Sequence, residues 1–233
     1  MTPYIKPPLH KRIFRRIVLL EYVFPVVEWI AFLIQKKDIA RRQADDSLKL
    51  HLGCGPHLLP GWINGDMELY PGVLPQKLPR GLKYFASDSV RCIYCSHFVE
   101  HLDYPGDALA FLQECRRILR PGGALRIIVP GIEPILRAYV ADNQVFFKLQ
   151  AEMHPADCTT KLEHLMYALQ QEGQHKYGYD YETMAKLLGR AGFKKVYPGE
   201  YNTSPVEDLR IEYRVARDET GAQIDLCVEA IKT

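Results

Sequence analysis

The stretch LKLHLGCG, residues 48–55, decides the fold of this chain. Its apolar residues predict a short buried strand, which breaks at a turn containing Gly53 and Gly55. The stretch GWINGD, residues 61–66, predicts a second short strand that ends in the carboxylate Asp66. A glycine turn after one strand and a carboxylate ending the next are typical of sheets that bind nucleosides at the carboxyl ends of their strands.

Strands and helices alternate from this point onward. RCIYCS (91–96) and ALRIIVP (124–130) predict buried strands, and the apolar spacing of residues 107–119 predicts a helix that stops before Pro121-Gly122-Gly123. The alternation predicts an α/β fold with a doubly wound, Rossmann-like sheet and a site at its topological switch point. The other expected strands are 81–85, 194–198 and 224–232; residues 132–172 should be mostly helical, 181–191 a helix and 71–81 a loop.

Composition narrows the class of protein. The chain has 233 residues, 47% of them hydrophobic, and a formal charge of +2, so we expect one well-packed domain and no nucleic-acid partner. The six cysteines are scattered. Cys92 and Cys95 form a C-x-x-C on a strand, where residues three apart point to opposite faces, so we expect reduced thiols and a cytoplasmic protein.

An N-terminal extension, residues 1–47, precedes the domain expected over residues 48–233. Residues 17–34 are rich in apolar side chains, but Glu21, Pro25 and Glu28 interrupt them, so a membrane-spanning helix is disfavoured. We expect an amphipathic helix over residues 17–34, with basic flanks that extend the segment to residues 11–42. It could lie on an anionic membrane surface, which would make the protein peripheral on the inner membrane face, or pack on protein as a cap or in a homodimer.

The glycine loop suggests the kind of ligand. Gly53-Cys54-Gly55 allows close backbone approach, and Asp66 is placed to accept hydrogen bonds from ribose hydroxyls. The chain lacks a third glycine at dinucleotide spacing and lacks G-K-[ST]. We therefore expect a ligand that contains a nucleoside but no pyrophosphate.

Five segments together resemble a known family. LHLGCG, GWINGD, IYCSHFVEHL, CRRILRPGGALRIIVP and YDYETMAKLLGRAGF occur in the order seen in class I S-adenosylmethionine-dependent methyltransferases of the type 11 group. The chain especially resembles predicted methyltransferases of bacterial surface-glycan and lipid biosynthesis. This resemblance implies seven mostly parallel strands with an antiparallel last strand, and S-adenosylmethionine as the cofactor.

The resemblance also implies site residues. Gly53, Cys54 and Gly55 would lie beneath the methionine moiety and Asp66 would hold the ribose. The sulfonium would be bordered by Cys95, Ser96 and His97, and Asp88 is the nearest candidate for the carboxylate on the adenine side. The chain departs from the wider superfamily at His51 and Arg91, which stand where acidic residues are usual.

His97-Phe98-Val99-Glu100-His101 directly follows the strand at 91–96. His97 or His101 could act as a general base, since an imidazole titrates near neutral pH. Glu100 and His101 could instead brace the following helix. The segment also resembles the E-x-x-E-H cation site of quinone-biosynthesis O-methyltransferases, but His97 replaces the first glutamate. Its H-x-x-E-H spacing matches a zinc-protease motif as well, but those proteases carry the motif inside a helix, whereas here it follows a strand. We therefore expect no metal.

A polar, aromatic segment, EGQHKYGYDYET (172–183), precedes the last predicted helix. His175 is a third candidate base. Tyr177, Tyr179 and Tyr181 could cover a glycan or phenolic acceptor, or could pack on the sheet.

The function expected from these residues is methyl transfer from S-adenosylmethionine to a hydroxyl oxygen of a glycan, lipid-linked or small-molecule substrate. The alternative is a binding or assembly subunit. In it a degenerate methyltransferase fold is tethered through the N-terminal helix, and His51 and Arg91 mark lost chemistry.

Overall fold

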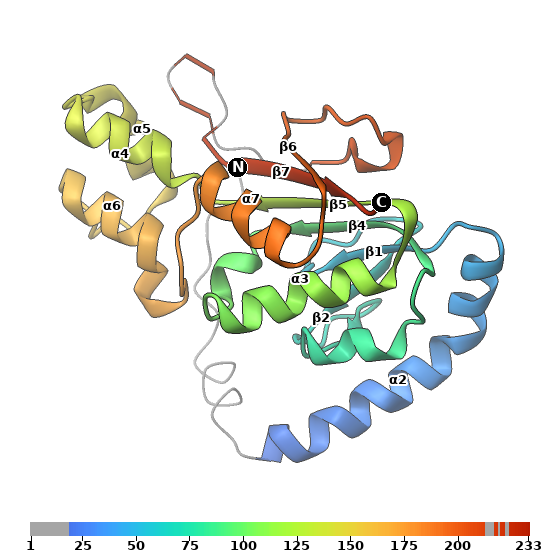
Figure 1. Cartoon of the computed structure of the whole chain (residues 1–233). Coiled ribbons are helices and arrows are strands. Elements are labelled where there is room, and N and C mark those ends of the chain that lie inside the picture. Colours follow the sequence, from blue (N-terminus) through green and yellow to red (C-terminus); the bar gives the residue numbers. More distant parts are fainter. Residues whose placement is uncertain (1–18, 213–216, 219, 222–223) are drawn as a thin grey trace.

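The computed structural model describes residues 19–233, except 213–216, 219 and 222–223 (Figure 1). The basic residues expected to precede the N-terminal helix lie outside the described residues: Lys11, Arg12, Arg15 and Arg16.

A seven-stranded sheet forms the centre of the described chain, in the order β3-β2-β1-β4-β5-β7-β6. Neighbouring strands from β3 to β5 run parallel, while β7 runs antiparallel to both β5 and β6. The predicted fold class, with its antiparallel last strand, is confirmed. The strands are β1 (Lys49–Leu52), β2 (Ile63–Asp66), β3 (Leu74–Pro75), β4 (Val90–Ser96), β5 (Leu119–Val129), β6 (Lys195–Pro198) and β7 (Leu226–Ile231).

The two faces of the sheet are covered differently. One face packs on α3 (Gly106–Ile118) and α7 (Tyr181–Arg190), which lie side by side in front of the sheet in Figure 1. Leu50 and Cys95 belong to this larger core. Cys92 and Tyr94 face the opposite way, where residues 199–212, including the short helix η4 (Glu207–Leu209), cover the sheet. The C-x-x-C thiols thus lie on opposite faces and are free, as predicted.

A buried arginine holds residues 199–212 on the sheet. Arg126 of β5 is fully buried and forms ion pairs with Glu212 and Glu229. It also donates to the carbonyl oxygens of Glu200 (2.6 Å) and Thr203 (3.0 Å). Charged groups are rarely buried unless paired in this way, so this cluster attaches the segment at one defined place.

Two predicted elements near the sheet edge are wrong. Residues 80–84 form the 3-10 helix η1 (Arg80–Tyr84) instead of a strand. The strand at this edge, β3, is two residues long and lies inside the predicted loop 71–81. Only Leu74 of β3 is buried there, so the sequence carries no repeating apolar pattern that would reveal it.

Three helices form a separate insertion beyond the carboxyl end of β5: α4 (Ile132–Val140), α5 (Gln144–Met153) and α6 (Lys161–Gln170). They share a core of their own and lie to one side of the sheet in Figure 1. The insertion leaves and rejoins the sheet at one point, because Gly131 and Tyr179 form a β-bridge and Ile132 N–H donates to the Tyr179 carbonyl (3.4 Å).

The N-terminal helix α2 (Leu19–Ala44) runs along the periphery of the domain (Figure 1). Phe24 and Glu28, one turn apart, are both buried against the domain, and Lys77 N–H donates to Glu28 Oε1 at 2.7 Å. The docked face of α2 thus carries both an apolar ring and a carboxylate. The face that contains Glu28 is docked, and apolar residues face outward.

Candidate functional site

The carboxyl ends of β1, β2 and β4 meet at one edge of the sheet, where the glycine loop begins. Gly53 N–H donates to the Gly65 carbonyl at 2.9 Å, which fixes the loop to β2. Gly53 and Gly55 have φ angles of +68° and +51°, a left-handed conformation that side chains rarely adopt. The two glycines are thus required by the backbone turn itself.

Asp66, the last residue of β2, lies beside this loop as predicted. Its Oδ2 accepts the Gly55 N–H at 2.8 Å, and its Oδ1 accepts the Glu68 N–H at 2.8 Å. Each carboxylate oxygen can accept more than one hydrogen bond. Asp66 can therefore hold the loop and still accept hydrogen bonds from the hydroxyls of a ribose.

The space around the two glycines differs. A Cβ on Gly53 would lie 2.5 Å from the Phe98 ring, so Phe98 packs directly against this residue. A Cβ on Gly55 would meet no atom of the described residues within 4 Å, its chain neighbours aside. Open space beside Gly55, bordered by the Asp66 carboxylate, fits the nucleoside part of a cofactor.

The cysteines near this edge are not reactive groups. Burial raises the pKa of the Cys54 thiol to about 12 and that of Cys95 well above its ordinary value. Cys95 belongs to the core beneath the sheet. Only the backbone of Cys95, together with Ser96 and His97, is therefore available to border a ligand at the end of β4.

Asp88 is not brought to this edge. It precedes the first residue of β4, at the end of the sheet opposite to the glycine loop, and pairs with Lys232 at 2.9 Å. The prediction that Asp88 contacts the cofactor is corrected by this position.

His97 directly follows β4 with a φ of +53°. Its Nδ1 lies 3.5 Å from Glu100 Oε1 and its Nε2 3.7 Å from Asp225 Oδ1. Burial lowers the pKa of this imidazole, but the carboxylates of Asp225 and Glu100 outweigh burial and raise the pKa to about 9. A ring that already carries its proton at neutral pH cannot serve as a general base, which argues against that role for His97.

His101 and His175 come together although 73 residues separate them in the chain. Their rings are 4.9 Å apart between centroids. His101 Nδ1 lies 3.0 Å from the Gln174 carbonyl oxygen, and His175 Nδ1 lies 2.9 Å from that of Ala168. A carbonyl oxygen only accepts, so each Nδ1 carries a hydrogen, and in the neutral ring Nε2 is then the nitrogen with the lone pair. Burial lowers the pKa of His175, which favours this neutral form.

The aromatic segment before α7 packs inward. Tyr177 stacks on Tyr104 with ring centroids 3.9 Å apart, and Tyr179 is buried. Burial, followed by the charge of Glu100, raises the pKa of Tyr179. The alternative in which these tyrosines pack on the domain therefore fits Tyr177 and Tyr179.

Sequence reasoning missed Phe98, Tyr104 and Asp225 as neighbours of this site. Nothing in the sequence marks Phe98 or Tyr104. The position of Asp225 could have been predicted, because this residue precedes an antiparallel strand. Such a strand begins at the edge where its parallel neighbours end, and the pairing of Leu226 with Val129 shows this.

The two departures from the family pattern have structural partners. His51 is buried in β1 with its Nδ1 3.2 Å from Asn64 Oδ1. Arg91, at the start of β4, pairs with Asp208 at 3.0 Å. Arg91 lies far from the carboxyl ends of the strands, so it does not displace a group at the glycine loop.

Comparison with known proteins agrees with this geometry. Residues 76–127 match the family described as "Methyltransferase domain". No curated protein matches the chain significantly. Among solved structures, a SAM-dependent methyltransferase from Archaeoglobus fulgidus is similar, with a TM-score of 0.51 and 17% identity over 86% of this chain and 99% of that one.

Two further structures are more distant. A SAM-dependent methyltransferase from Thermotoga maritima has a TM-score of 0.46 and 16% identity, over 95% of this chain and 99% of its own. Phosphoethanolamine N-methyltransferase 2 of Haemonchus contortus, in complex with S-adenosyl-L-methionine, has a TM-score of 0.44 and 13% identity, over 80% of this chain and 48% of its own.

The fold is that of the class I methyltransferases, an α/β Rossmann-like sheet of seven strands. The cofactor that goes with this fold and with the matched family is S-adenosylmethionine, as predicted from the sequence. The open space beside Gly55 and the carboxylate of Asp66 suit its nucleoside.

Proposed function

We propose that this chain transfers the methyl group of S-adenosylmethionine to a hydroxyl oxygen of a glycan, lipid-linked or small-molecule acceptor. The observation that carries the proposal is the shared edge: the Gly53–Gly55 loop with Asp66, and the His97–His101 segment after β4, follow neighbouring parallel strands. A nucleoside site and a group of ionisable side chains thus lie at the same end of the sheet.

Some site residues would bind the cofactor, and others would act on the acceptor. Gly55 and Asp66 would hold the nucleoside of S-adenosylmethionine, and the carboxyl end of β4 would border the sulfonium of this cofactor. S-adenosylmethionine supplies a methyl group on a positively charged sulfur, which leaves as a neutral thioether. Alignment of nucleophile, methyl and sulfur is the main contribution expected of the protein. The free Nε2 lone pairs of His101 and His175 can take up the proton of the acceptor hydroxyl.

The alternative of a degenerate binding subunit loses support, because Asp66 lies hydrogen-bonded beside the Gly53–Gly55 turn and because His51 and Arg91 have structural partners. Calorimetry with S-adenosylmethionine, followed by an acceptor screen that measures S-adenosylhomocysteine, separates the two. We expect cofactor binding, and product with a hydroxyl acceptor. A folded protein that does not bind the cofactor would exclude the enzyme proposal, and product formed only with amine or carbon acceptors would exclude the hydroxyl.

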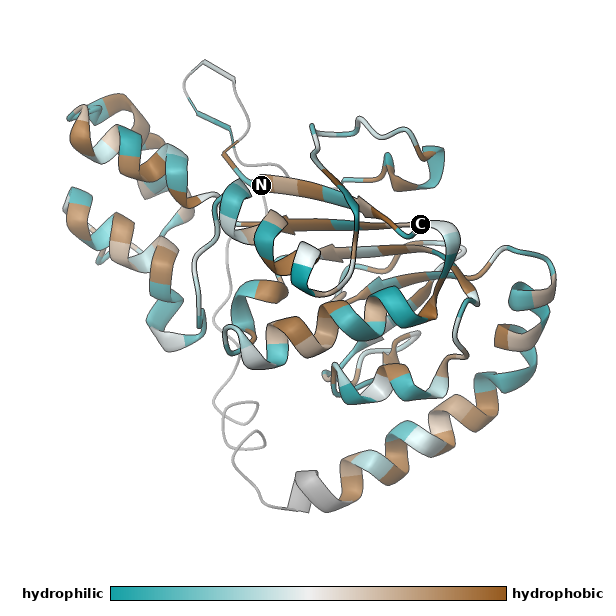
Figure 2. Ribbon diagram, viewed as in Figure 1, coloured by the Kyte–Doolittle hydropathy of each residue, from teal (hydrophilic) through white to brown (hydrophobic). Residues whose placement is uncertain are grey.

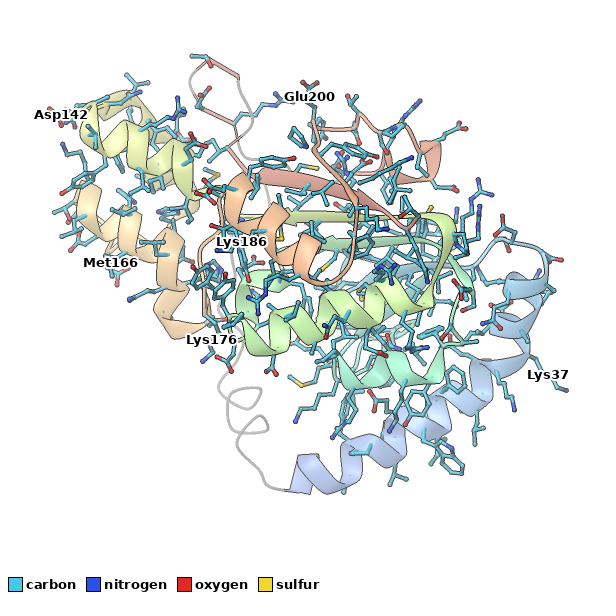
Figure 3. All side chains as sticks on the ribbon, viewed as in Figure 1. Lys37, Asp142, Met166, Lys176, Lys186 and Glu200 are labelled. Atoms are coloured by element: carbon cyan, nitrogen blue, oxygen red, sulfur yellow. The ribbon has the colours of Figure 1, made fainter. Side chains whose placement is uncertain are left out.

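We also propose that α2 places the enzyme on an anionic membrane surface. Hydrophobic residues recur along the ribbon of α2 (Figure 2), and several of them are exposed. No helix among the described residues is long and apolar enough to cross a bilayer. Lys36 and Lys37 are exposed beyond the outer face of α2, and Lys37 projects away from the domain in Figure 3. The exposed apolar residues are Val23, Val26, Trp29, Ile30, Leu33 and Ile34.

A bilayer suits this helix for two reasons. An in-plane helix buries its apolar face between headgroups and acyl chains, and basic residues near anionic lipid add about 1 kcal/mol each. The polar residue Glu28 is already bound to the domain, so it does not oppose insertion of the outer face.

Sedimentation with vesicles of phosphatidylcholine and phosphatidylglycerol tests this proposal. We expect binding at low salt that weakens at high salt, and loss of binding in Leu33→Glu. Leu136→Glu, at an equally exposed site on α4, is the matched control and should still bind. Unchanged binding of Leu33→Glu would refute the proposal. So would a dimer that does not sediment and that Leu33→Glu dissociates, because the occupant of this face would then be a second copy.

A further inference from the structure

Three side chains at the candidate site converge in a way that neither the fold nor the proposed methyl transfer requires. One ligand atom each from Glu100, His101 and His175 lies within 4.8 Å of the other two. Glu100 and His101 belong to the short helix η2 (Val99–His101) directly after β4, while His175 lies between α6 and α7.

Both imidazoles are oriented as metal-binding histidines usually are. Each donates its Nδ1 hydrogen to a backbone carbonyl, His101 to Gln174 and His175 to Ala168. Metal-binding histidines almost always make this second hydrogen bond, because it fixes the ring and leaves the other nitrogen free to coordinate. In the neutral rings, Nε2 is thus the nitrogen left for an ion.

The carboxylate of Glu100 lacks hydrogen bonds. The residue is 1% exposed, and neither of its oxygens accepts a hydrogen bond from any described residue. His97, the nearest ring, approaches Oε1 only to 3.5 Å. A buried carboxylate is costly unless a cation or hydrogen-bond donors compensate for its lost hydration. The charge of His97 beside Oε1 offsets part of this cost, but neither Glu100 oxygen accepts a hydrogen bond from a described residue, so the carboxylate can still bind a second cation.

The backbone holds the three groups in register. Lys176 N–H and Tyr177 N–H both donate to the Glu100 carbonyl, at 2.7 Å and 3.3 Å. Lys176 marks this connection between α6 and α7 in Figure 3. The segment that carries His175 is thus attached to the residue that supplies the carboxylate, so the ligands are positioned before any ion arrives.

We propose that Glu100, His101 and His175 bind a divalent transition-metal ion, with zinc the best match. Two imidazole nitrogens and one carboxylate oxygen form a three-ligand set that leaves a fourth position open. Zinc bonds of about 2 Å place ligand atoms roughly 3.4 Å apart in a tetrahedral site, so atoms that lie within 4.8 Å of one another would approach by up to about 1.4 Å on binding. His97 is not a ligand, because it lies between Glu100 and Asp225.

This site replaces the expectation of a metal-free protein and changes the role of the histidines. With an ion bound, His101 and His175 would be ligands instead of bases, and the open position would orient an acceptor oxygen and lower its pKa. That role rests on the proposed function, whereas ion binding does not.

The test measures binding first. Protein freed of metal with a chelator is titrated with zinc chloride by calorimetry, and cobalt chloride is added separately to record the intense visible absorption of tetrahedral Co²⁺. We expect one ion per chain, a tetrahedral cobalt spectrum, and at least about 100-fold weaker binding in His175→Ala, with recovery in His175→Cys. His154→Ala is the matched control, because His154 and His164 form another histidine pair with their Nδ1 atoms 3.0 Å apart.

Each outcome decides the proposal. Absence of zinc binding by the folded wild-type protein, or equal binding by His175→Ala, would overturn it. Loss of binding in His154→Ala alone would also overturn it, by moving the ion to the other pair. Calorimetry with S-adenosylmethionine on the same samples keeps the two proposals apart: cofactor binding and turnover by a protein that binds no zinc refute only the metal site, and zinc binding without cofactor binding refutes only the proposed function.

Discussion

Gly53 and Gly55 both have a positive φ, but substitution by alanine should mainly lower stability at Gly53 and mainly weaken cofactor binding at Gly55. In Gly55→Ala the added methyl meets no described atom, so the loss of stability is limited to left-handed backbone strain of about 1–2 kcal/mol. In Gly53→Ala the methyl overlaps Phe98, with Cγ at 2.5 Å and Cβ at 2.6 Å. Rotation of the ring cannot move Cβ, so the backbone must shift, which adds about 1–3 kcal/mol of overpacking.

Two measurements on each variant test this reasoning. In urea unfolding, Gly53→Ala should lose about 2–5 kcal/mol and Gly55→Ala clearly less. In calorimetry with S-adenosylmethionine the order should reverse. The Gly55→Ala methyl would enter the space assigned to the cofactor and weaken binding about tenfold or more, whereas a folded Gly53→Ala should bind more nearly like the wild type.

The refuting result is equal loss of stability in both variants, which would mean that Phe98 does not pack on Gly53. Unchanged affinity in a folded Gly55→Ala protein would remove the open side of the loop from the cofactor site. Phe98→Ala in the Gly53→Ala background should restore only part of the lost stability, because alanine at position 98 retains the Cβ that would lie 2.6 Å from the new methyl group at position 53.

Three further predictions concern single side chains. Asp66→Ala should weaken S-adenosylmethionine binding by about 1.5–3 kcal/mol in calorimetry, because a charged acceptor for ribose hydroxyls is lost; unchanged affinity would exclude Asp66 from the site. Burial lowers the pKa of His51 from 6.5 to about 4, so as the pH falls the unfolded chain takes up this proton before the folded chain does. The free energy of unfolding should therefore fall by about 3 kcal/mol as the pH drops from 6.5 to 4. Urea unfolding of His51→Gln should show a flatter pH dependence. Arg126→Met should cost about 3–5 kcal/mol in the same assay, since Glu212 and Glu229 stay buried without their partner; a loss below about 1 kcal/mol would contradict the account of this cluster.

The local parts of the site could be predicted from the sequence. The glycine turn after β1 and the carboxylate ending β2 depend on residues within a few positions of each other, and parallel pairing of neighbouring strands brings them together. The prediction that Asp88 contacts the cofactor was wrong because of the same rule for parallel strands. A residue before a parallel strand lies at the edge opposite to one that follows it, and Asp88 comes before β4.

Long-range contacts could not be predicted. No sequence pattern reports that His175 lies against His101, because the contact depends on the path of α4, α5 and α6 and on two hydrogen bonds to the Glu100 carbonyl. The amphipathic pattern of α2 likewise predicts that the helix has two faces. It does not say which face binds the domain, and the hydrogen bond from Lys77 to Glu28 decides that.

The helical insertion has a consequence for how this fold can change. Its two ends meet at the Gly131–Tyr179 bridge, so the sheet places no condition on how many residues lie between them. The core of α4, α5 and α6 is also separate from that of the sheet. Recombination could therefore exchange these helices for others as a cassette while leaving the strands and the glycine loop intact. Because His175 lies near the end of the cassette, the same exchange would also decide whether the three-ligand cluster is complete.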